Sequence, residues 1–393
     1  MKPAYAIPSV AEILAQEPTG LTVISTFSGA GGSCLGYRWA GYTVVWASEF
    51  IPAARDTYRA NFPDAILDER DIRTVAATDI FKAPGLGGGE VDILEGSPPC
   101  ASFSLAGQRD KTWGEVKPYS DTKQRTDDLF GEWTRLVKDV QPRVCIAENV
   151  PALATGTAVG YFKQVTRAIA EAGYTVKAVE LDAQWLGVPQ RRKRLFIIGV
   201  RSDLRRSPAF PKPLSYWYSI RDAIPDIEGE IEHASGFESF KRDRRGSSPP
   251  GHAWYSTNQP AETVFASKAT RVRGYAPRFD EQAKSSEPYA IYDEWKKLEY
   301  GGQSQKYFNL VKSDPDQAAQ TITQLGGNPS AASITHPTEP RKFTIPELKR
   351  ICGFPDDFTL TGSYPQQYER LGRAVCPPVT KAIGDTIRAR VLT

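Results

Sequence analysis

The chain has 393 residues, of which 40% are hydrophobic and 24% are charged, and its formal net charge is +3. This length allows one large core and a smaller domain, and the composition is ordinary for a soluble globular enzyme. So small a net charge does not by itself indicate a polyanionic partner. Basic residues do form four clusters, with aromatic residues among them, at 191–194, 201–206, 241–245 and 268–273. These clusters suit a nucleic-acid-binding face, although solvated surface charge explains them equally well.

Cysteine and histidine usage argues against a disulfide framework and against a metal centre. The five cysteines are odd in number and widely separated, and the chain has three histidines. No Cys-x-x-Cys pair is present, so no zinc site is predicted and no metal cofactor is expected. No apolar run approaches the roughly 20 residues of a membrane span, and the first residues lack a signal-peptide pattern. A cytoplasmic protein with no membrane partner is therefore predicted.

Apolar runs alternate with helical stretches in the first half of the chain. Six runs are predicted to be strands, with a weak seventh, at residues 21–27, 43–47, 91–94, 143–147, 175–181, 195–200 and 65–67. Short strands separated by helices are typical of βαβ units. The predicted fold class is therefore α/β, with a Rossmann-like, mostly parallel sheet.

The pattern changes after about residue 201. Proline, glycine, serine and charged residues dominate as far as about residue 340, with short strand-like runs at 262–266 and 320–323. This composition predicts a loop-rich second domain. Helical patterns return at 345–352 and 377–390, and the apolar stripe of the last helix needs a partner surface. The predicted division is 1–204, 205–335 and a C-terminal segment, 336–393, that returns to the first domain.

A cysteine stands where the third strand should end. The tetrapeptide Ser-Pro-Pro-Cys at 97–100 directly follows the apolar run 91–96. Ligands of parallel sheets gather at this edge, and two prolines stiffen the approach to the thiol. Cys100 alone would still be interpreted as a buried, inert residue.

Three features at successive strand ends suggest a cofactor site. Residues 27–32, Phe-Ser-Gly-Ala-Gly-Gly, follow the first strand, Glu49 follows the second and Asp71 comes after the weak one. Glycines let backbone approach a ligand, and an acidic group about twenty residues on binds ribose hydroxyls in dinucleotide folds. The glycine loop alone is a weak signal, but together the three features favour an adenosine-bearing cofactor. The spacing is not Gly-x-Gly-x-x-Gly, so NAD is less favoured.

Taken in order, the motifs resemble those of the DNA (cytosine-5) methyltransferase family. The resemblance rests on 27–32, on 97–100 with the Phe-Ser pair at 103–104, on Glu-Asn-Val at 148–150, on Gln-x-Arg-x-Arg at 190–194, on the segment 341–355 and on Gly-Arg-Ala-Val at 372–375. It covers nearly the whole chain except about 205–315, where the family has its variable target-recognition domain. It implies an S-adenosylmethionine-dependent methyltransferase fold in 1–204, a target-recognition domain in 205–335, and a monomer that acts on double-stranded DNA in a bacterial or phage-infected cell.

The resemblance also implies a role for each motif. Cys100 would add to C6 of a flipped-out cytosine, which makes C5 nucleophilic, and Glu148 would bind N3 and the exocyclic amine. Arg192 would hold the O2 side of the base, and Arg194 would support the site. Ser104 and Gln190 would contact DNA. The cofactor would contact Phe27, Ser28, Gly29, Ala30, Gly31, Gly32, Glu49, Asp71, Ile72, Pro98, Arg373, Ala374 and Val375.

Arg373 stands where the family usually has asparagine, close to the cofactor's sulfonium. A guanidinium about 6 Å from that positive charge would cost on the order of 3 kcal/mol at an effective dielectric near 20. A carboxylate on the transferred carbon would reverse the sign. One hypothesis is therefore that carboxy-S-adenosylmethionine is the cofactor and 5-carboxymethylcytosine the product. The other is that Arg373 turns outward to a DNA phosphate and methyl transfer is unchanged.

Two further functions stay open at this point. One branch of the family methylates RNA cytosine, although the long segment from 205 to 315 favours DNA. A DNA-binding regulator with an inactive transferase fold is disfavoured because Cys100, Glu148, Arg192 and the glycine loop are all present.

Overall fold

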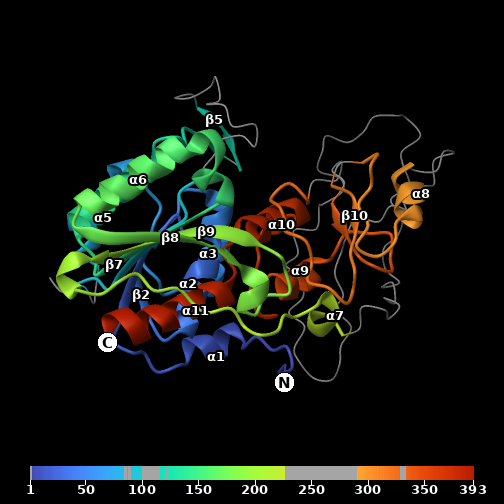
Figure 1. Ribbon diagram of the computed structural model, residues 1–393, viewed down its shortest axis with the longest axis horizontal. Coiled ribbons are helices and arrows are strands. Elements are labelled where there is room, and N and C mark those ends of the chain that lie inside the picture. The colour runs from blue at the N-terminus through green and yellow to red at the C-terminus, as the bar shows by residue number, and fades with distance from the viewer. Residues whose placement is uncertain are drawn as a thin grey trace.

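The computed structural model describes residues 2–83, 86, 90–99, 116–120, 122–225, 290–307, 309–327 and 333–393. Cys100 and Ser104 lie outside these residues, as does the strand expected at 262–266. A large lobe is built around a central sheet, and a smaller lobe that carries α8 and β10 lies to its right in Figure 1.

A seven-stranded sheet forms the centre of the large lobe, in the order β3-β2-β1-β4-β7-β9-β8. Its strands are β1 (Thr22–Thr26), β2 (Thr43–Ser48), β3 (Leu67–Asp68), β4 (Ile93–Gly96), β7 (Val144–Asn149), β8 (Tyr174–Asp182) and β9 (Lys193–Arg201). The pairs from β3 to β7 are parallel, while β9 runs antiparallel to both β7 and β8. The predicted α/β class and mostly parallel sheet are confirmed, and all seven predicted strands belong to this sheet.

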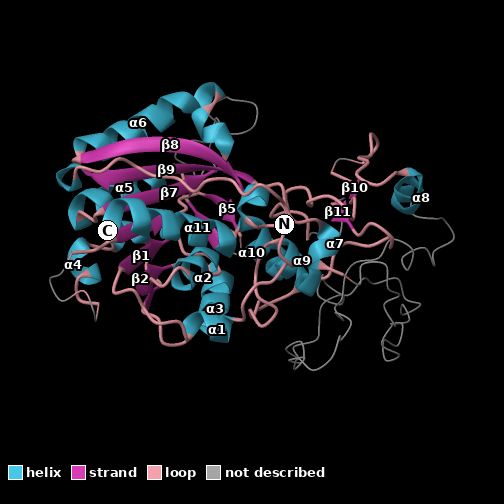
Figure 2. Cartoon of the chain, turned by 60° about the horizontal axis from the view of Figure 1, so that its bottom comes forward, coloured by secondary structure: helices cyan, strands magenta, loops and turns pink. Residues whose placement is uncertain are grey.

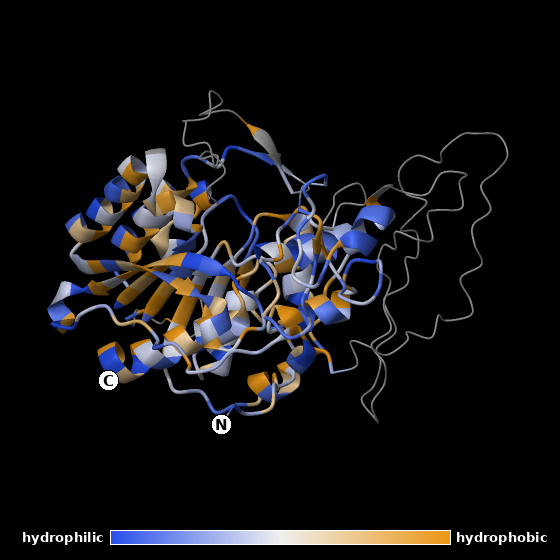
Figure 3. Cartoon of the chain, turned by 45° about the vertical axis from the view of Figure 1, so that its right-hand side comes forward, coloured by the Kyte–Doolittle hydropathy of each residue, from blue (hydrophilic) through white to orange (hydrophobic). Residues whose placement is uncertain are grey.

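The apolar runs form buried strands because both faces of the sheet are covered. Val23, Ile93 and Ile198 belong to the core on one face, whereas the adjacent residues Ile24, Leu94 and Ile197 belong to the core on the other. Successive side chains of a strand point to opposite faces, so a strand covered on both sides reads as a continuous apolar run. Figure 3 shows these strands as the most hydrophobic part of the lobe.

The helices form a layer on each face (Figures 1 and 2). Residues of α4 (Ala77–Ile80), α5 (Leu129–Val140) and α6 (Val159–Glu171) share one core. The other core includes residues of α1 (Val10–Leu14), α2 (Gly32–Trp39), α3 (Pro52–Asn61), α7 (Ile220–Ala223), α9 (Ile345–Ile351), α10 (Tyr364–Arg373) and α11 (Pro377–Ile387). In the smaller lobe, α8 (Ala290–Lys297) lies near the short parallel pair β10 (Val311–Lys312) and β11 (Ile334–Thr335).

The C-terminal segment packs against the start of the chain. Val379, Ile383 and Ile387 of α11 are buried, and the Tyr42 hydroxyl donates to the Gly384 carbonyl at 2.8 Å. The last helix therefore has the partner surface that its apolar stripe required. It ends at Ile387 and continues as a π-helical turn, Arg388–Leu392.

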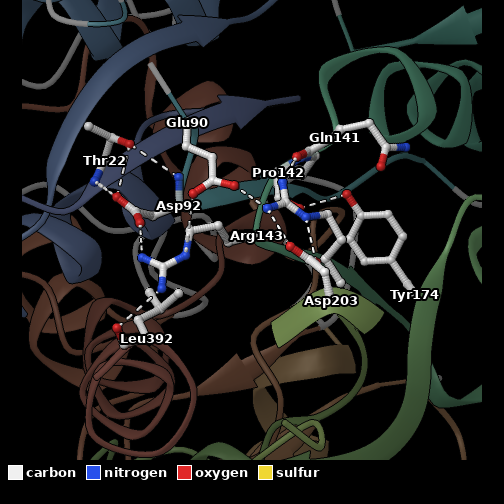
Figure 4. Close-up of polar contacts among 10 residues, drawn as sticks. Thr22, Glu90, Asp92, Gln141, Pro142, Arg143, Tyr174, Asp203 and Leu392 are labelled. Atoms are coloured by element: carbon white, nitrogen blue, oxygen red, sulfur yellow. Dashed lines mark hydrogen bonds and ion pairs between the residues drawn. The ribbon is translucent and has the colours of Figure 1, made fainter. Parts of the chain in front are cut away.

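An ion pair joins the starts of β1, β4 and β7, at the end of the sheet opposite the motif-bearing strand ends (Figure 4). Asp92 accepts hydrogen bonds from the Thr22 amide at 2.8 Å and from Arg143 Nη1 at 2.9 Å. The other end nitrogen of Arg143, Nη2, donates to the Leu392 carbonyl at 3.3 Å. This group joins the central strands to the end of the chain, away from the strand ends that carry the motifs.

The strand expected at 320–323 is not formed. Residues 320–323 have no regular structure, although Ala319 makes an isolated bridge to Gln190 and Ile322 is fully buried. Ile322 packs against the loop that contains Gln190, whereas Thr321 is half-buried and Thr323 is exposed. The pattern therefore indicated one buried position rather than strand pairing.

The contact between α2 and α11 leaves no room for a side chain at Gly36. A Cβ placed there would overlap the Thr380 hydroxyl and the Pro377 carbonyl. We expect Gly36→Ala to lower the free energy of unfolding by about 1–3 kcal/mol. Gly131 in α5 is the matched control, since its Cβ would meet nothing within 4 Å, and Gly131→Ala should raise stability by about 0.5–1 kcal/mol. Urea denaturation checks both, and a Gly36→Ala variant as stable as the parent would contradict this packing.

Candidate active site

The loop after β1 takes conformations that favour glycine. Phe27, Gly29 and Gly31 have positive φ values of 52°, 56° and 91°. A Cβ at Gly31 would lie 2.6 Å from the Phe62 ring, and α2 begins at the next residue. The glycines therefore let the chain turn sharply and bring its backbone close to whatever lies beyond the end of β1.

Glu49 holds this loop in place. Its carboxylate accepts from the Gly29 amide at 2.8 Å and from the Ile51 amide at 2.7 Å. Burial raises the pKa of Glu49, while these amide hydrogen bonds lower it. The prediction that Glu49 follows the second strand is confirmed, because β2 ends at Ser48.

A cavity opens at this edge of the sheet, with a volume of about 960 Å³ that includes space open to solvent. It is lined by most of the residues predicted to contact a cofactor, namely Phe27, Ser28, Gly29, Ala30, Gly32, Glu49, Asp71, Ile72, Arg373, Ala374 and Val375. Gly31 and Pro98 do not line it, although the neighbours of Pro98, Ser97 and Pro99, do. Segments from five distant parts of the chain therefore meet at one cavity.

Asp71 reaches the cavity wall from a short turn after β3. Its carboxylate accepts from the Arg73 amide at 3.0 Å and so caps the 3-10 turn Ile72–Thr74. Arg73 also forms an ion pair with it at 2.8 Å. These contacts fix the direction of the carboxylate beside the cavity.

One wall of the cavity was not predicted from the sequence. Tyr119, Ser120 and Gln124 line it, and they belong to the hairpin of β5 (Lys117–Tyr119) and β6 (Thr122–Gln124) or to its turn. Arg370 Nη2 of α10 lines the same cavity and donates to the Ser120 hydroxyl at 2.5 Å. A three-residue strand carries too weak a pattern to be recognised.

Arg373 lies in the cavity wall and is held there. Its Nε donates to Glu369 at 2.8 Å, and its guanidinium lies 4.1 Å from the centre of the Tyr119 ring. Arg373 and Tyr119 both line the cavity, and Glu369 compensates part of the charge of the guanidinium.

Glu148 lies at the end of β7 and pairs with Arg194. The distance from Arg194 Nε to the Glu148 carboxylate is 3.0 Å, and only 9% of Glu148 is exposed. Burial lowers the pKa of Arg194 to about 10, and the nearby positive charge of Arg192 acts in the same direction. A buried carboxylate paired with a guanidinium at a sheet edge can bind a heterocycle that has both donors and acceptors.

The next residue ties this strand to the proline segment. Asn149 Nδ2 donates to the Pro98 carbonyl at 3.0 Å. The chain immediately before Cys100 is therefore fixed next to Glu148, even though Cys100 itself is outside the described residues.

Arg192 and Gln190 point into the protein rather than toward an open surface. Arg192 is 3% exposed and donates to the carbonyls of Ile322, Gly372 and Ala374 at 2.9–3.1 Å. Gln190 is fully buried and accepts from the Ile322 amide at 3.2 Å. Both residues bind Ile322, and Arg192 also reaches Ala374 in the cavity wall. The guanidinium that contacts Glu148 is that of Arg194.

A second buried carboxyl, Glu95, lies beneath the cofactor loop and was missed in the sequence. It is 4% exposed and accepts hydrogen bonds from the hydroxyls of Ser25 and of Ser33, the latter at 2.8 Å. Burial raises the pKa of Glu95 to about 7, although these serine hydrogen bonds lower it. A single acidic residue within an apolar run forms no recognisable motif, so the sequence did not indicate a role for Glu95.

Cys34, Cys145, Cys352 and Cys376 are buried. In the described residues no cluster of three or more histidine, cysteine or carboxylate side chains could hold a metal ion. None of the helices in that same part of the chain combines the length and apolarity needed to cross a membrane.

Replacing Arg192 should destabilise the protein. Arg192→Met leaves the carbonyls of Ile322, Gly372 and Ala374 without this donor, so we expect the free energy of unfolding to fall by about 2–4 kcal/mol. Arg191→Met is the matched control, because the Arg191 side chain is exposed and should change stability by less than about 0.5 kcal/mol. Thermal and urea denaturation measure both, and equal stability of the two variants would contradict the bracing role.

Comparison with known proteins places this site in a family. The type II methyltransferase M1.HphI of Haemophilus parahaemolyticus is 28% identical over 93% of this chain and 86% of its own length. The type II methyltransferase M.MthTI of Methanothermobacter thermautotrophicus is 29% identical, with 94% of this chain and 97% of that protein covered. An E. coli prophage protein described as a DNA modification methyltransferase has the same fold, with a TM-score of 0.69, 21% identity and coverage of 95% and 100%. The family model for C-5 cytosine-specific DNA methylase matches residues 21–389, and the chain therefore belongs to that family.

Proposed function

We propose that the protein transfers a methyl group from S-adenosylmethionine to C5 of cytosine in double-stranded DNA, acting as a monomer. The observation that carries this proposal is the hydrogen bond from Asn149 to the Pro98 carbonyl. It fixes the segment that leads into Cys100 next to Glu148, while Ser97 and Pro99 line the cavity. We infer from this contact that the nucleophile, the carboxyl group and the cofactor cavity are parts of one site.

The cavity fits the proposed cofactor. Glu49 and Asp71 offer carboxylate oxygens for ribose hydroxyls and for an adenine amino group, and Phe27 offers an aromatic wall. Gly29 and Gly32 leave room for close approach of the backbone. When bound, S-adenosylmethionine supplies an electrophilic methyl group.

The chain's own residues would prepare the base. Cys100 adds to C6 as a thiolate, which makes C5 nucleophilic, and departs when the C5 proton is lost. Glu148 binds N3 and the exocyclic amine, which favours addition and selects cytosine. Arg194, which pairs with Glu148, would hold the O2 side of the cytosine. Arg192 would instead stabilise the site through its hydrogen bonds to main-chain carbonyls. These atoms are out of reach in a stacked duplex, so the base has to be flipped out.

We further propose that residues 205–335 recognise the target and that 1–204, joined by 336–393, carry the chemistry. The packing of α11 on α2 supports the return of 336–393 to the first domain. Residues 320–324, at the end of the proposed recognition region, pack against Gln190 and Arg192. Ser104 and the surface near residues 191–194 would contact DNA.

Replacing the nucleophile gives the direct test. Cys100→Ser should reduce turnover by at least about a thousandfold, because a hydroxyl is far less nucleophilic than a thiolate. Mass spectrometry of nucleosides from incubated DNA measures the product. Cys145→Ser is the control, since Cys145 is buried in β7 and does not line the cavity. Full turnover of Cys100→Ser would rule out the proposed mechanism.

Carboxymethyl transfer from carboxy-S-adenosylmethionine is a second candidate. The position of Arg373 in the cavity wall favours it, whereas the compensating carboxylate of Glu369 favours the ordinary cofactor. Because of that compensation, methyl transfer is the first candidate.

The cofactor preference decides between these candidates. If carboxymethyl transfer is the activity, Arg373→Asn should lower the ratio of carboxymethyl to methyl product by about tenfold or more, as loss of a bidentate charge pair predicts. Both cofactors are supplied in equal amount, and the two modified nucleosides are quantified by mass spectrometry. No carboxymethyl product from the parent enzyme, or an unchanged ratio in the variant, would exclude this candidate.

Two alternatives are separated by substrate and by trapping. Modification of tRNA but not of duplex DNA would indicate an RNA methyltransferase. DNA that contains 5-fluorocytosine should form a covalent adduct at Cys100, because fluorine cannot leave as the proton does. Absence of an adduct would favour a DNA-binding protein without activity.

A further inference from the structure

Glu95 is part of a buried polar network directly beneath the cofactor cavity. Its carboxylate accepts from Ser25 and Ser33, and the Ser25 hydroxyl is 2.9 Å from that of Ser28. Ser28 and Ser33 both line the cavity. We call these four residues the serine–glutamate network. It connects β4 to the end of β1, to the cofactor loop and to the first turn of α2.

The network contains a carboxyl group without a cation. In the described part of the chain, the charged side chain that acts on Glu95 is Glu148, which is also acidic. From α2, Cys34 and Tyr37 face it, and burial raises the pKa of both above their ordinary values, so they stay neutral. A buried carboxylate without a positive partner is costly. A positive charge that arrives with a ligand would remove that cost.

The proposed cofactor carries such a charge on its sulfur. The methyl group must reach a base bound to Cys100, which directly follows Pro99 in the cavity wall. Ser97 and Pro99 continue from the end of β4, the strand that contains Glu95. A charged sulfur held on the β4 side of the cavity would lie above the serine–glutamate network.

We propose that Glu95 is a positioning residue that recognises the sulfonium charge through Ser28 and Ser33, so that the protein binds the charged cofactor in preference to the neutral thioether product. This inference rests on the proposed function. S-adenosylmethionine and S-adenosylhomocysteine share the adenosine and the amino acid group, and they differ in the methyl group and charge at sulfur. A carboxylate beneath the sulfur attracts one and not the other.

The preference has to depend on pH. Ionised Glu95 attracts the sulfonium and protonated Glu95 does not, and its pKa is about 7. The affinity for S-adenosylmethionine relative to S-adenosylhomocysteine should therefore rise as the pH increases through 7. The stability of the protein without ligand depends on pH in the opposite direction. Because the pKa of Glu95 is raised in the folded state, the free energy of unfolding falls as the pH rises toward 7.

Calorimetric titration of the full chain with each ligand at pH 6, 7 and 8 tests the inference. For the wild type we expect the affinity ratio to rise about fivefold from pH 6 to pH 8, as a linked ionisation near pH 7 requires. For Glu95→Gln the ratio should be lower at pH 8 and nearly constant with pH. Titration of the ligand's own amino group is the same in both proteins and cancels in the comparison.

Asp92→Asn is the matched control. Asp92 is also buried and precedes the same strand, but it lies at the opposite edge, where Arg143 and Thr22 bind it (Figure 4). This variant should be less stable and yet keep the wild-type dependence of the affinity ratio on pH. The same loss of pH dependence in Asp92→Asn would overturn the assignment to Glu95.

The remaining outcomes are equally distinct. Equal pH dependence for both ligands in the wild type, or an unchanged profile in Glu95→Gln, overturns the inference but leaves the proposed function intact. Failure of both ligands to bind the wild type overturns the proposed function itself.

If Glu95→Gln does not fold, titrations of the wild type at pH 7 in two buffers of different ionisation enthalpy test the inference instead. More protons should be released with the sulfonium ligand than with the thioether, and equal release overturns the inference.

Discussion

Parallel pairing of β2, β1, β4 and β7 is the constraint on which the site depends. Because these strands run in one direction, the loop at Ser28, Glu49, the segment 97–99 and Glu148 all come to the same edge of the sheet. Ligands of open α/β sheets bind at that edge. The antiparallel strand β9 completes the arrangement, since its beginning lies opposite the end of β7. That reversal brings Arg194 to the carboxylate of Glu148.

Buried polar contacts hold the loops at this edge. Glu49 binds two backbone amides, Asn149 binds the Pro98 carbonyl, and Arg192 binds three carbonyls. An unsatisfied buried polar group is expensive, so each of these contacts fixes one arrangement of the loops rather than merely adding stability. The cavity is thus shaped by hydrogen bonds between side chains and the main chain, in which the Glu49 carboxylate accepts and the Asn149 amide and Arg192 guanidinium donate.

The sequence predicted the parts of the structure that depend on local pattern. Continuous apolar runs located the central strands of the sheet, because burial on both faces leaves that signature. The edge strands β3 and β8 are only partly buried, and weaker apolar runs located them. The position of Glu49 followed from its distance to the glycine loop. Contacts between distant segments could not be predicted in this way. The inward direction of Arg192, the wall made by Tyr119 and Ser120, and the carboxyl group of Glu95 under the loop depend on tertiary packing, which no spacing of residues encodes.

The tight fit of Gly372 has a consequence for exchanging sequence specificity between relatives. A Cβ at Gly372 would lie 2.6 Å from the Gln324 amide nitrogen and from the Thr323 carbonyl carbon, so the two backbones touch. Residues 323 and 324 fall inside the proposed recognition region, but they are packed as part of the catalytic lobe. A hybrid enzyme spliced at the outer limits of that region would import foreign backbone into this contact. Junctions placed before residue 319 would keep the native interface while replacing the portion that precedes it.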